Sequence, residues 1–305
     1  MNELKSPEQI LQICKALGSD LRMQIVLLLR QNQSMNLNEL SEALGVTNGA
    51  MTSHIKILSE AGIIQICHLS GKRGSQKSCS LKETQFFLDL ADSTLLQNTY
   101  ETEIPIGQYN HYAAYPTCGI STPEAIIGQV DDSRYFDSPM RYQAGILWFT
   151  KGFLEYRIPN YLKPHQSPTE IQISFEISSE APGVENNWPS DIFFFLNDIP
   201  LGYWTSPGDF GDSRGIYSPS WWPTNWNQYG LLKLLSINRE GTFIDGEKIY
   251  DTTIDDLQLT SQSEIRFRFS VGETGERAGG FTLFGRGFGN YNQDIRVSVA
   301  YEEQI

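Results

Sequence analysis

Aromatic and polar side chains are concentrated in the stretch PSWWPTNWNQYG, which runs from Pro219 to Gly230. An indole ring can lie against the C–H face of a pyranose, while carboxylate, amide and guanidinium groups form hydrogen bonds with its hydroxyls. Such groups occur within this stretch and in neighbouring loops. The candidate ligand-binding residues are Asp209, Asp212, Arg214, Trp221, Trp222, Asn225, Trp226 and Arg286. Of these, we expect Trp222 and Trp226 to face the ligand.

A packing role is the alternative interpretation of the same stretch. Exposing a tryptophan is costly, so several of the chain's six tryptophans are expected in a core or beneath a loop. Arg214 and Arg286 could equally pair with acidic neighbours and hold the loops in place. The residues alone do not decide between ligand binding and packing. The concentration of aromatic rings, hydrogen-bond donors and acceptors in one segment is nevertheless typical of a binding site.

A second group of polar side chains lies between residues 47 and 77, where the local charge is basic. Glu60 is the only acidic residue over residues 46–82, among several lysines and an arginine. Short polar side chains at the start of a helix can contact base edges in a major groove, and basic residues on a hairpin can neutralise phosphates. The candidate DNA-binding residues are Thr47, Asn48, Thr52, Ser53, His54, Lys56, Lys72, Arg73 and Lys77.

Hydrophobic periodicity predicts the elements that would position this second group. Apolar residues recur at helical spacing over residues 7–18, from Asp20 onward, over 37–44 and over 48–61. Thr47 or Asn48 is the expected N-cap of the last of these helices. Two strands are predicted around the glycine-bounded turn SGKRGSQK, over residues 63–69 and 76–81.

Three segments in this region carry a family resemblance: ALGSDLRMQIVLLL, NLNELSEALGVTNGAMTSHIKILSEAGII and GKRG. They resemble the ArsR/SmtB-type bacterial repressors over residues 1–92. The resemblance implies a winged helix-turn-helix that binds a DNA operator as a homodimer, with a last helix over about 83–97 forming the dimer contact. Ser53 is a departure, because the family often has a basic residue just before the histidine of the recognition helix.

Metal sensing, which many members of that family perform, lacks its usual ligands here. The third helix reads NLNEL without cysteine, and the expected last helix reads ETQFFLDLADSTLLQ without histidine. Cys67 and Cys79 lie on opposite predicted wing strands, which leaves metal or redox sensing as a minor alternative. We therefore expect no metal and no other cofactor.

The rest of the chain changes to a period of two, which is typical of strands. Apolar and polar residues alternate over 171–177, 265–271 and 295–301. Shorter strands are predicted over 103–109, 145–150, 153–158, 191–197, 230–237, 242–250 and 280–285. The fold class is therefore α+β with two domains, a mainly α winged helix-turn-helix followed by an all-β sandwich resembling a jelly roll. The expected boundaries are 1–98 and 99–305.

This second domain also resembles the C-terminal domain that follows such heads in a set of ArsR-type regulators. The motifs that carry the resemblance are PTCGIST, DDSRYFDSP, FGDSRG, WWPTNWNQYGLLK and FGRGFGNYNQDI. No enzyme is expected, because His111 and His165 form no metal motif and no nucleophile elbow occurs. The acidic pairs in its loops are more typical of caps and turns than of a glycosidase couple.

Charge and cysteine content limit the partners. Residues 1–92 carry equal numbers of basic and acidic side chains, so the whole net charge of −13 falls on residues 93–305. Nucleic acid should therefore contact only the first domain, and the four cysteines are expected as reduced thiols. The sequence shows no signal peptide and no 18-residue apolar run, so we expect a cytoplasmic protein without a membrane partner.

The combined expectation is a homodimeric DNA-binding transcription factor whose β domain senses a small molecule, for which a saccharide is the favoured class. The alternative is that the β domain is a structural or protein-docking module without a small-molecule ligand, with the tryptophan-rich stretch forming an interface patch.

Overall fold

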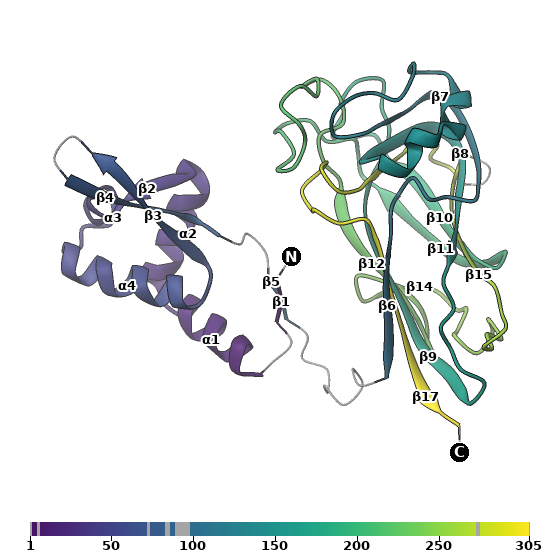
Figure 1. Cartoon of the computed structure of the whole chain (residues 1–305), viewed down its shortest axis with the longest axis horizontal. Helices are drawn as coiled ribbons and strands as arrows, with labels where there is room; N and C mark the ends of the chain where they lie inside the picture. The colour runs from purple at the N-terminus through teal and green to yellow at the C-terminus, as the bar shows by residue number, and fades with distance from the viewer. Residues whose placement is uncertain are drawn as a thin grey trace. The chain divides into compact units, whose positions relative to one another are not determined.

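The computed structural model describes residues 2–4, 7–71, 74–82, 86–88, 98–272 and 275–304 of the chain (Figure 1). The chain divides into two compact units, unit 1 over Met1–Ser93 and unit 2 over Thr94–Ile305. Each unit buries a hydrophobic core of its own.

Unit 1 is a small helical domain with a β-hairpin. Its helices are α1 (Pro7–Leu17), α2 (Asp20–Asn32), α3 (Leu37–Leu44) and α4 (Asn48–Glu60). The hairpin consists of β3 (Ile64–Gly71) and β4 (Gly74–Leu81), and β2 (Ser34–Asn36) pairs antiparallel with β4. Each predicted helix and strand up to residue 82 is present, with ends within a few residues of those expected.

Local capping explains where α3 and α4 begin. The Asn36 side chain accepts hydrogen bonds from the backbone N–H groups of Asn38 and Glu39, and the Glu39 carboxylate accepts the N–H of Asn36 in return. Gly45 ends α3 in a left-handed conformation, with φ of 65°. Thr47 caps α4, because its hydroxyl accepts the N–H of Ala50. These short turns fix α3 against α4.

The end of unit 1 differs from expectation. Phe86–Leu88 form strand β5, which pairs in parallel with β1 (Asn2–Leu4). The predicted helix over about 83–97 is therefore wrong at these three residues, and its remaining residues, 83–85 and 89–97, lie outside the described part of the chain. The strand-to-strand pairing satisfies backbone groups that a helix would have satisfied internally.

Unit 2 is an all-β domain, and its described strands form one twelve-stranded sheet. The strands are β6 (Thr99–Ile104), β7 (His111–Ser121), β8 (Ile146–Ile158), β9 (Gln166–Ser178), β10 (Ser190–Leu196), β11 (Ile199–Ser206), β12 (Leu231–Asn238), β13 (Gly241–Ile244), β14 (Glu247–Tyr250), β15 (Ile265–Val271), β16 (Phe281–Phe284) and β17 (Ile295–Glu303). Two short 3-10 helices, η2 (Ser133–Asp137) and η3 (Pro139–Gln143), interrupt the chain between β7 and β8.

The sheet is bent until it is nearly a barrel. Its main path runs β11-β10-β15-β8-β16-β9-β12-β13-β14, and β17 lies between β9 and β6, as Figure 1 shows. The two ends of the path approach each other, since the Thr252 hydroxyl just beyond β14 donates to the Pro200 carbonyl in β11 at 2.9 Å. The all-β class is confirmed, whereas the jelly-roll arrangement is not established by this topology.

The predicted alternation places the expected side chains in the core. Ile171, Ile173, Phe175 and Ile177 of β9 are fully buried, and the apolar positions of β15 are buried with them. Strands β7 and β11 are absent from the prediction. Neither HYAAYPTCGIS nor IPLGYWTS alternates cleanly. Both faces of β7 are partly covered, and in β11 the adjacent residues Leu201 and Gly202 are both buried.

Glu176 in β9 joins two loops to the sheet. It is fully buried, and its carboxylate accepts backbone N–H groups from Gly230, Asn290 and Tyr291 at 2.8 to 3.1 Å. Burial raises the pKa of Glu176 to about 8, against the lowering effect of these three donors. The contacts tie the end of the 207–230 loop and the middle of the 285–294 loop to one side chain.

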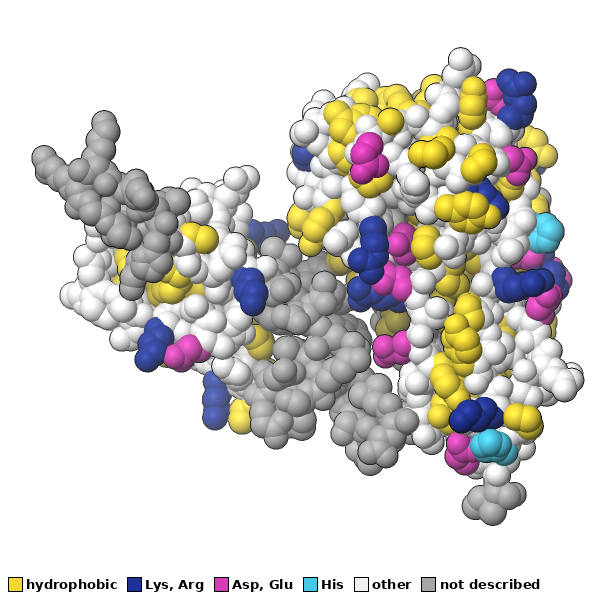
Figure 2. Space-filling view, in the orientation of Figure 1, with side chains coloured by type: hydrophobic (Ala, Val, Ile, Leu, Met, Phe, Trp, Pro, Cys, Tyr) yellow, Lys and Arg dark blue, Asp and Glu magenta, His cyan; other side chains and the backbone are white. Residues whose placement is uncertain are grey.

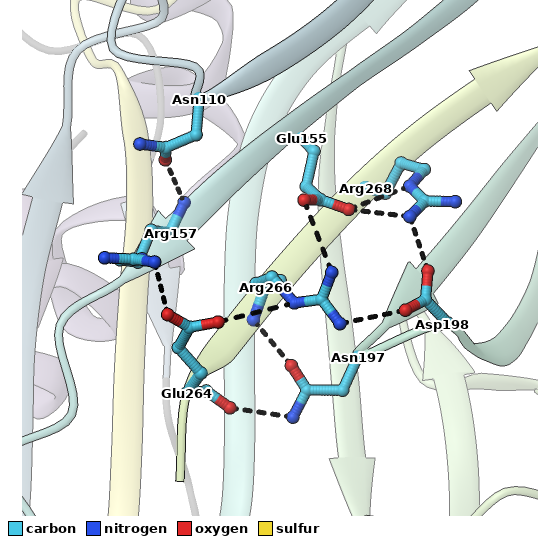
Figure 3. A network of polar contacts seen from close by, with 8 residues as sticks. All are labelled: Asn110, Glu155, Arg157, Asn197, Asp198, Glu264, Arg266 and Arg268. Atoms are coloured by element: carbon cyan, nitrogen blue, oxygen red, sulfur yellow. Dashed lines mark hydrogen bonds and ion pairs between the residues drawn. The ribbon is translucent and has the colours of Figure 1, made fainter.

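A second polar network lies on the face of the β8–β15 pair (Figure 3). Glu155, which is only 3% exposed, accepts two hydrogen bonds from the Arg268 guanidinium at 3.0 and 2.7 Å. Arg268 and Arg266 also bind Asp198 in the turn after β10, and Glu264 contacts Arg157 and Arg266. Figure 3 shows these charges alternating across the strands, so each buried charge has a partner.

Charges elsewhere on unit 2 are also mixed. Acidic and basic side chains lie next to one another on the face shown in Figure 2. Ion pairs such as Arg239 with Glu302 join β17 to the turn after β12. The negative net charge of this unit is therefore partly neutralised at short range.

We predict that Glu155→Ala destabilises unit 2 by about 2 kcal/mol, because it removes the buried acceptor of two Arg268 hydrogen bonds and leaves this partly buried guanidinium to the half-exposed Asp198. Urea unfolding followed by tryptophan fluorescence measures this, since every tryptophan lies in unit 2. The control is Glu264→Ala, whose half-exposed carboxylate should contribute less than about 1 kcal/mol. Equal effects of the two substitutions would contradict the prediction.

We also predict that Glu176→Gln destabilises unit 2 by about 1–3 kcal/mol. The amide nitrogen of Gln has no lone pair with which to accept a backbone N–H, so at least one buried donor loses its partner. The same unfolding measurement applies. Glu170→Gln, in a half-buried position of the same strand, is the matched control and should change stability little.

Candidate functional site

Helix α4 is held in unit 1 by one face and exposes the other. Met51, Ile55 and Leu58 are fully buried in the core, so the helix cannot rotate. Thr52 and Ser53 lie on the opposite, exposed face. Their hydroxyls donate to the carbonyls of Asn48 and Gly49, at 2.7 and 3.4 Å. Each hydroxyl oxygen still has lone pairs with which to accept a hydrogen bond from outside.

The start of α4 is connected to α3 by a side-chain contact. The Asn48 amide donates to the Asn38 side-chain oxygen at 2.9 Å, and both residues are exposed. Thr47 is occupied as the N-cap of the helix. The predicted polar group at this helix end is therefore assembled, with Thr47 and Asn48 partly engaged in holding the turn.

The remaining predicted DNA contacts vary in how far the structure describes them. Lys56 is exposed and lies 3.7 Å from Glu60, one turn along the helix. His54 is half-buried, and its Nδ1 finds no hydrogen-bond partner among the described residues. Lys72 and Arg73 lie outside the described residues, and for Lys77 only the backbone, paired with His68 in the hairpin, is described.

The two wing cysteines lie on different faces of the hairpin. Cys79 is buried and opposite Ile66, whereas Cys67 is exposed and opposite Ser78. The thiols therefore point away from each other, an arrangement that does not suit a shared metal ion or a disulfide.

In unit 2, the loop of residues 207–230 connects β11 to β12. Trp222 is buried and holds this loop against the rest of the domain. Trp222 is 1% exposed and packs edge-on against Trp226 at 5.0 Å, Phe288 at 4.9 Å and Trp148 at 5.8 Å. Its indole N–H donates to the Asn227 carbonyl at 2.9 Å. The expectation that Trp222 faces a ligand is wrong, because both its ring and its N–H are occupied by the protein itself.

Four other predicted ligand residues hold loops instead of lining a cavity. Trp221 is 41% exposed, but its N–H donates to the Pro123 carbonyl. Arg214 donates to the carbonyls of Pro219 and Trp222. Asp212 accepts the hydroxyl of Tyr229, and burial together with this bond raises the pKa of Tyr229 to about 12.

Arg286 is also part of a separate cluster. Its guanidinium forms ion pairs with Glu103 and Asp294, which join the 285–294 loop to β6. For Arg214 and Arg286 the structure thus favours the packing interpretation over direct ligand contact.

A cleft of about 340 Å³ is lined in part by the 207–230 loop. It is lined by Thr117, Val130, Asp131, Trp148, Glu180, Ala181, Pro182, Gly183, Asp209, Asn225, Trp226 and Asn227. Asp209, Asn225 and Trp226 belong to the predicted set. Asn227 belongs to the same loop, and the other lining residues come from β7, the segment between β7 and η2, β8 and the segment after β9. Nothing in the local sequence of these other residues marks them as neighbours of the loop.

Two buried carboxyl groups form the polar wall of this cleft. Asp209 is 1% exposed; its Oδ2 accepts the N–H of Ala181 at 3.1 Å, while its Oδ1 has no hydrogen-bond partner within the described part of the chain. Burial raises the pKa of Asp209 to about 7. Burial, and secondly the negative charge of Asp209, raises the pKa of Glu180 well above its usual range.

Glu180 is fixed by three side chains. It accepts hydrogen bonds from the Asn227 amide at 3.1 Å, from the Thr282 hydroxyl at 3.2 Å and from the Thr117 hydroxyl at 3.3 Å. The carboxyl group is therefore held in one position, whereas one oxygen of Asp209 is desolvated and unsatisfied. Such an oxygen is costly to bury, which makes it a candidate contact for a bound molecule.

Residues 17–66 match a family model described as a helix-turn-helix domain. No curated protein matches the chain. Along the described residues, no helix is both long and apolar enough to cross a membrane.

Several solved structures resemble parts of the chain. One is the winged helix-turn-helix DNA-binding domain of a possible ArsR-family regulator from Mycobacterium bovis, with 20% identity, a TM-score of 0.23, and coverage of 25% of this chain and 66% of that one. Another is reduced HlyU from Vibrio cholerae, with 21% identity, a TM-score of 0.23, and coverage of 25% and 76%. The Cry4Aa toxin from Bacillus thuringiensis has 10% identity and a TM-score of 0.30, with coverage of 79% of this chain and 30% of the toxin.

At TM-scores this low, the three likenesses carry no argument about function. The matched family and the geometry of α3 and α4 agree on the same segment. Unit 1 of this chain therefore contains a helix-turn-helix domain, followed by a β-hairpin wing.

Proposed function

We propose that the chain is a DNA-binding transcription regulator of the ArsR type, and that unit 2 binds a small-molecule effector in the cleft beside Trp226. The observation that supports DNA binding is the exposed polar face of α4 within the matched helix-turn-helix segment. In that class of motif the second helix enters the major groove with its N-terminal residues toward the bases.

In this proposal α4 would contact bases through Thr52, Ser53 and Asn48. Lys56, one turn further along the helix, would neutralise a phosphate, and the basic wing would do the same on the neighbouring backbone. A homodimer is part of the proposal, because a two-fold operator requires two copies of the reading helix. No catalytic role is proposed for unit 2.

A saccharide or similarly hydroxylated molecule is the proposed effector class. The cleft combines an indole face at Trp226 with the exposed amide of Asn225 and the unsatisfied oxygen of Asp209. Its volume is at the lower end of the range of small-molecule sites. Binding would change operator affinity only if the effector prefers one of two states of the protein.

A protein-docking role for unit 2 is the second candidate. It is favoured by apolar side chains exposed on the same loop, with Ile216 61%, Tyr217 43% and Trp221 41% exposed. Such residues on a polar surface are typical of interface patches.

The DNA-binding proposal predicts that operator affinity falls steeply with salt concentration. Lys56→Ala should weaken binding to all sequences alike and reduce the salt slope by about 1, because one phosphate contact is lost. Fluorescence anisotropy with DNA fragments from the neighbourhood of the gene measures both. The control is Lys163→Ala, which removes an exposed lysine from unit 2 and should leave affinity unchanged. A response independent of salt would argue against DNA binding.

The effector proposal predicts that a bound sugar stabilises unit 2. A ligand at 100 times its dissociation constant adds about 2.7 kcal/mol to the free energy of unfolding, measured by thermal shift across a sugar panel. Trp226→Ala should abolish the shift, whereas Trp221→Ala, whose ring does not line the cleft, should preserve it. If no sugar stabilises the protein and Trp221→Ala releases a bound protein, the docking role replaces the sensor.

A further inference from the structure

We propose that the ligand of the Trp226 cleft carries a protonated primary amine, as a hydroxylated amine such as an amino sugar does, and that its ammonium group lies at Asp209. This inference rests on the proposed effector function, because it specifies the ligand class of the same cleft. Its charge distinguishes it from a neutral saccharide.

The charge of the cleft wall is the first argument. Three carboxyl groups line it, those of Asp131, Glu180 and Asp209, and none of the lining residues is basic. The same groups disfavour one another's ionisation, since the pKa of Glu180 is raised by burial and then by the charges of Asp209 and Asp131. A cation bound beside these carboxyl groups would favour their ionised form and offset their mutual repulsion, whereas an anion would add to that repulsion.

The unsatisfied oxygen of Asp209 is the second argument. Asp209 is 1% exposed, its Oδ2 accepts the N–H of Ala181, and none of the described residues donates to its Oδ1. A buried acceptor without a donor is destabilising, and hydrogen bonds that involve an ion are stronger than neutral ones. An ammonium N–H would supply both the missing donor and the opposite charge. A quaternary ammonium has no N–H and could not.

The indole rings are the third argument. Trp226 is half-buried in the cleft wall, and it is held by edge-on contacts with Trp222 at 5.0 Å and Trp148 at 5.8 Å. A fixed indole face attracts a cation and can also carry the C–H face of a sugar ring. The exposed amide of Asn225 and the hydroxyl of Thr117 lie on the same wall and can contact ligand hydroxyls.

A metal ion is the other cation to consider. Among the described residues, no group of three or more His, Cys, Asp or Glu side chains is arranged to hold one. Glu180 is already bound to Asn227, Thr282 and Thr117, so it offers little free coordination. An organic ammonium requires only one free carboxylate oxygen, which Asp209 provides.

The proposal includes a proton exchange. The other acidic groups of the cleft lining are Glu180 and Asp131, and the backbone of Glu185 pairs with that of Asp209. Because burial raises the pKa of Asp209 to about 7, its carboxyl is mostly protonated at pH 6. An ammonium at hydrogen-bond distance lowers that pKa again. Binding at pH 6 therefore releases a proton, and affinity for the amine rises as pH increases from 5 to 7.

The test is isothermal titration of the full-length protein with glucosamine, glucose and N-acetylglucosamine. Glucosamine should bind about tenfold or more tightly than the two neutral sugars, as expected for one charge-assisted hydrogen bond. Titrations at pH 6 in two buffers of different ionisation enthalpy should report release of roughly one proton with glucosamine and none with glucose. This measurement uses the unchanged protein and does not depend on any variant folding.

Asp209→Asn should remove the preference for glucosamine over glucose, since the amide keeps the shape of the side chain but not its charge. The matched control is Asp212→Asn, which changes a carboxylate of the same loop outside the cleft lining and should preserve the preference. The melting temperatures of both variants without ligand establish that they fold.

Equal affinity for glucose and glucosamine, retention of the preference in Asp209→Asn, or absence of binding by the amine would each overturn the inference. In the first of these results the effector function itself would stand, with a neutral sugar as ligand. Loss of DNA binding would instead be seen in the anisotropy experiment, which is independent of these titrations.

Discussion

The arrangement of unit 2 around its tryptophan loop depends on one buried carboxylate. Glu176 accepts N–H groups from Gly230, at the end of the 207–230 loop, and from Asn290 and Tyr291 in the second loop. The approach is so close that a Cβ at Gly289 would lie 2.4 Å from Oε1, and the φ of 72° at this residue also requires glycine. Fixing these two loops brings Phe288 onto Trp222 and places Trp226 in the lining of the cleft.

Periodicity alone predicts much of the fold. Met51, Ile55 and Leu58 recur at helical spacing and are buried, and Thr47 caps the helix they define. The alternation of Ile265 and Phe267 likewise identifies a strand with one face in the core. Prediction fails where no period exists. At Phe86–Leu88 the apolar residues suit a helix and a strand equally. These residues form a strand because their backbone pairs with Asn2–Leu4, more than 80 residues earlier in the chain.

The candidate cleft is only partly predictable, because its wall is assembled by tertiary contacts. The residue types around Pro219–Gly230 correctly suggest Asp209, Asn225 and Trp226 as neighbours. They cannot show which tryptophan is buried. Trp222 and Trp226 have similar neighbours in the sequence, and only the tertiary contacts bury the ring of Trp222 more deeply than that of Trp226. Arg286 looks like a ligand contact in the sequence, yet its partner Glu103 lies on a strand at the start of unit 2. No sequence motif marks Glu180 as a residue of the cleft, and only its burial in the folded structure identifies it as one.

In unit 1, Asn36 has two roles that join separate surfaces. Its backbone ends β2 opposite Ser78 of β4, and its side chain caps α3. The strand that pairs with the wing and the first helix of the helix-turn-helix therefore meet in a single residue, with no flexible linker between them. In the proposed DNA complex, the wing and the helix-turn-helix joined in this way would act as one bivalent DNA-binding surface: once either has contacted a duplex, the other meets it at a high effective concentration. Inserting even a few glycines at that junction would let the wing and the helix-turn-helix meet DNA separately. The overall affinity for DNA would fall, although no DNA-contacting residue had changed.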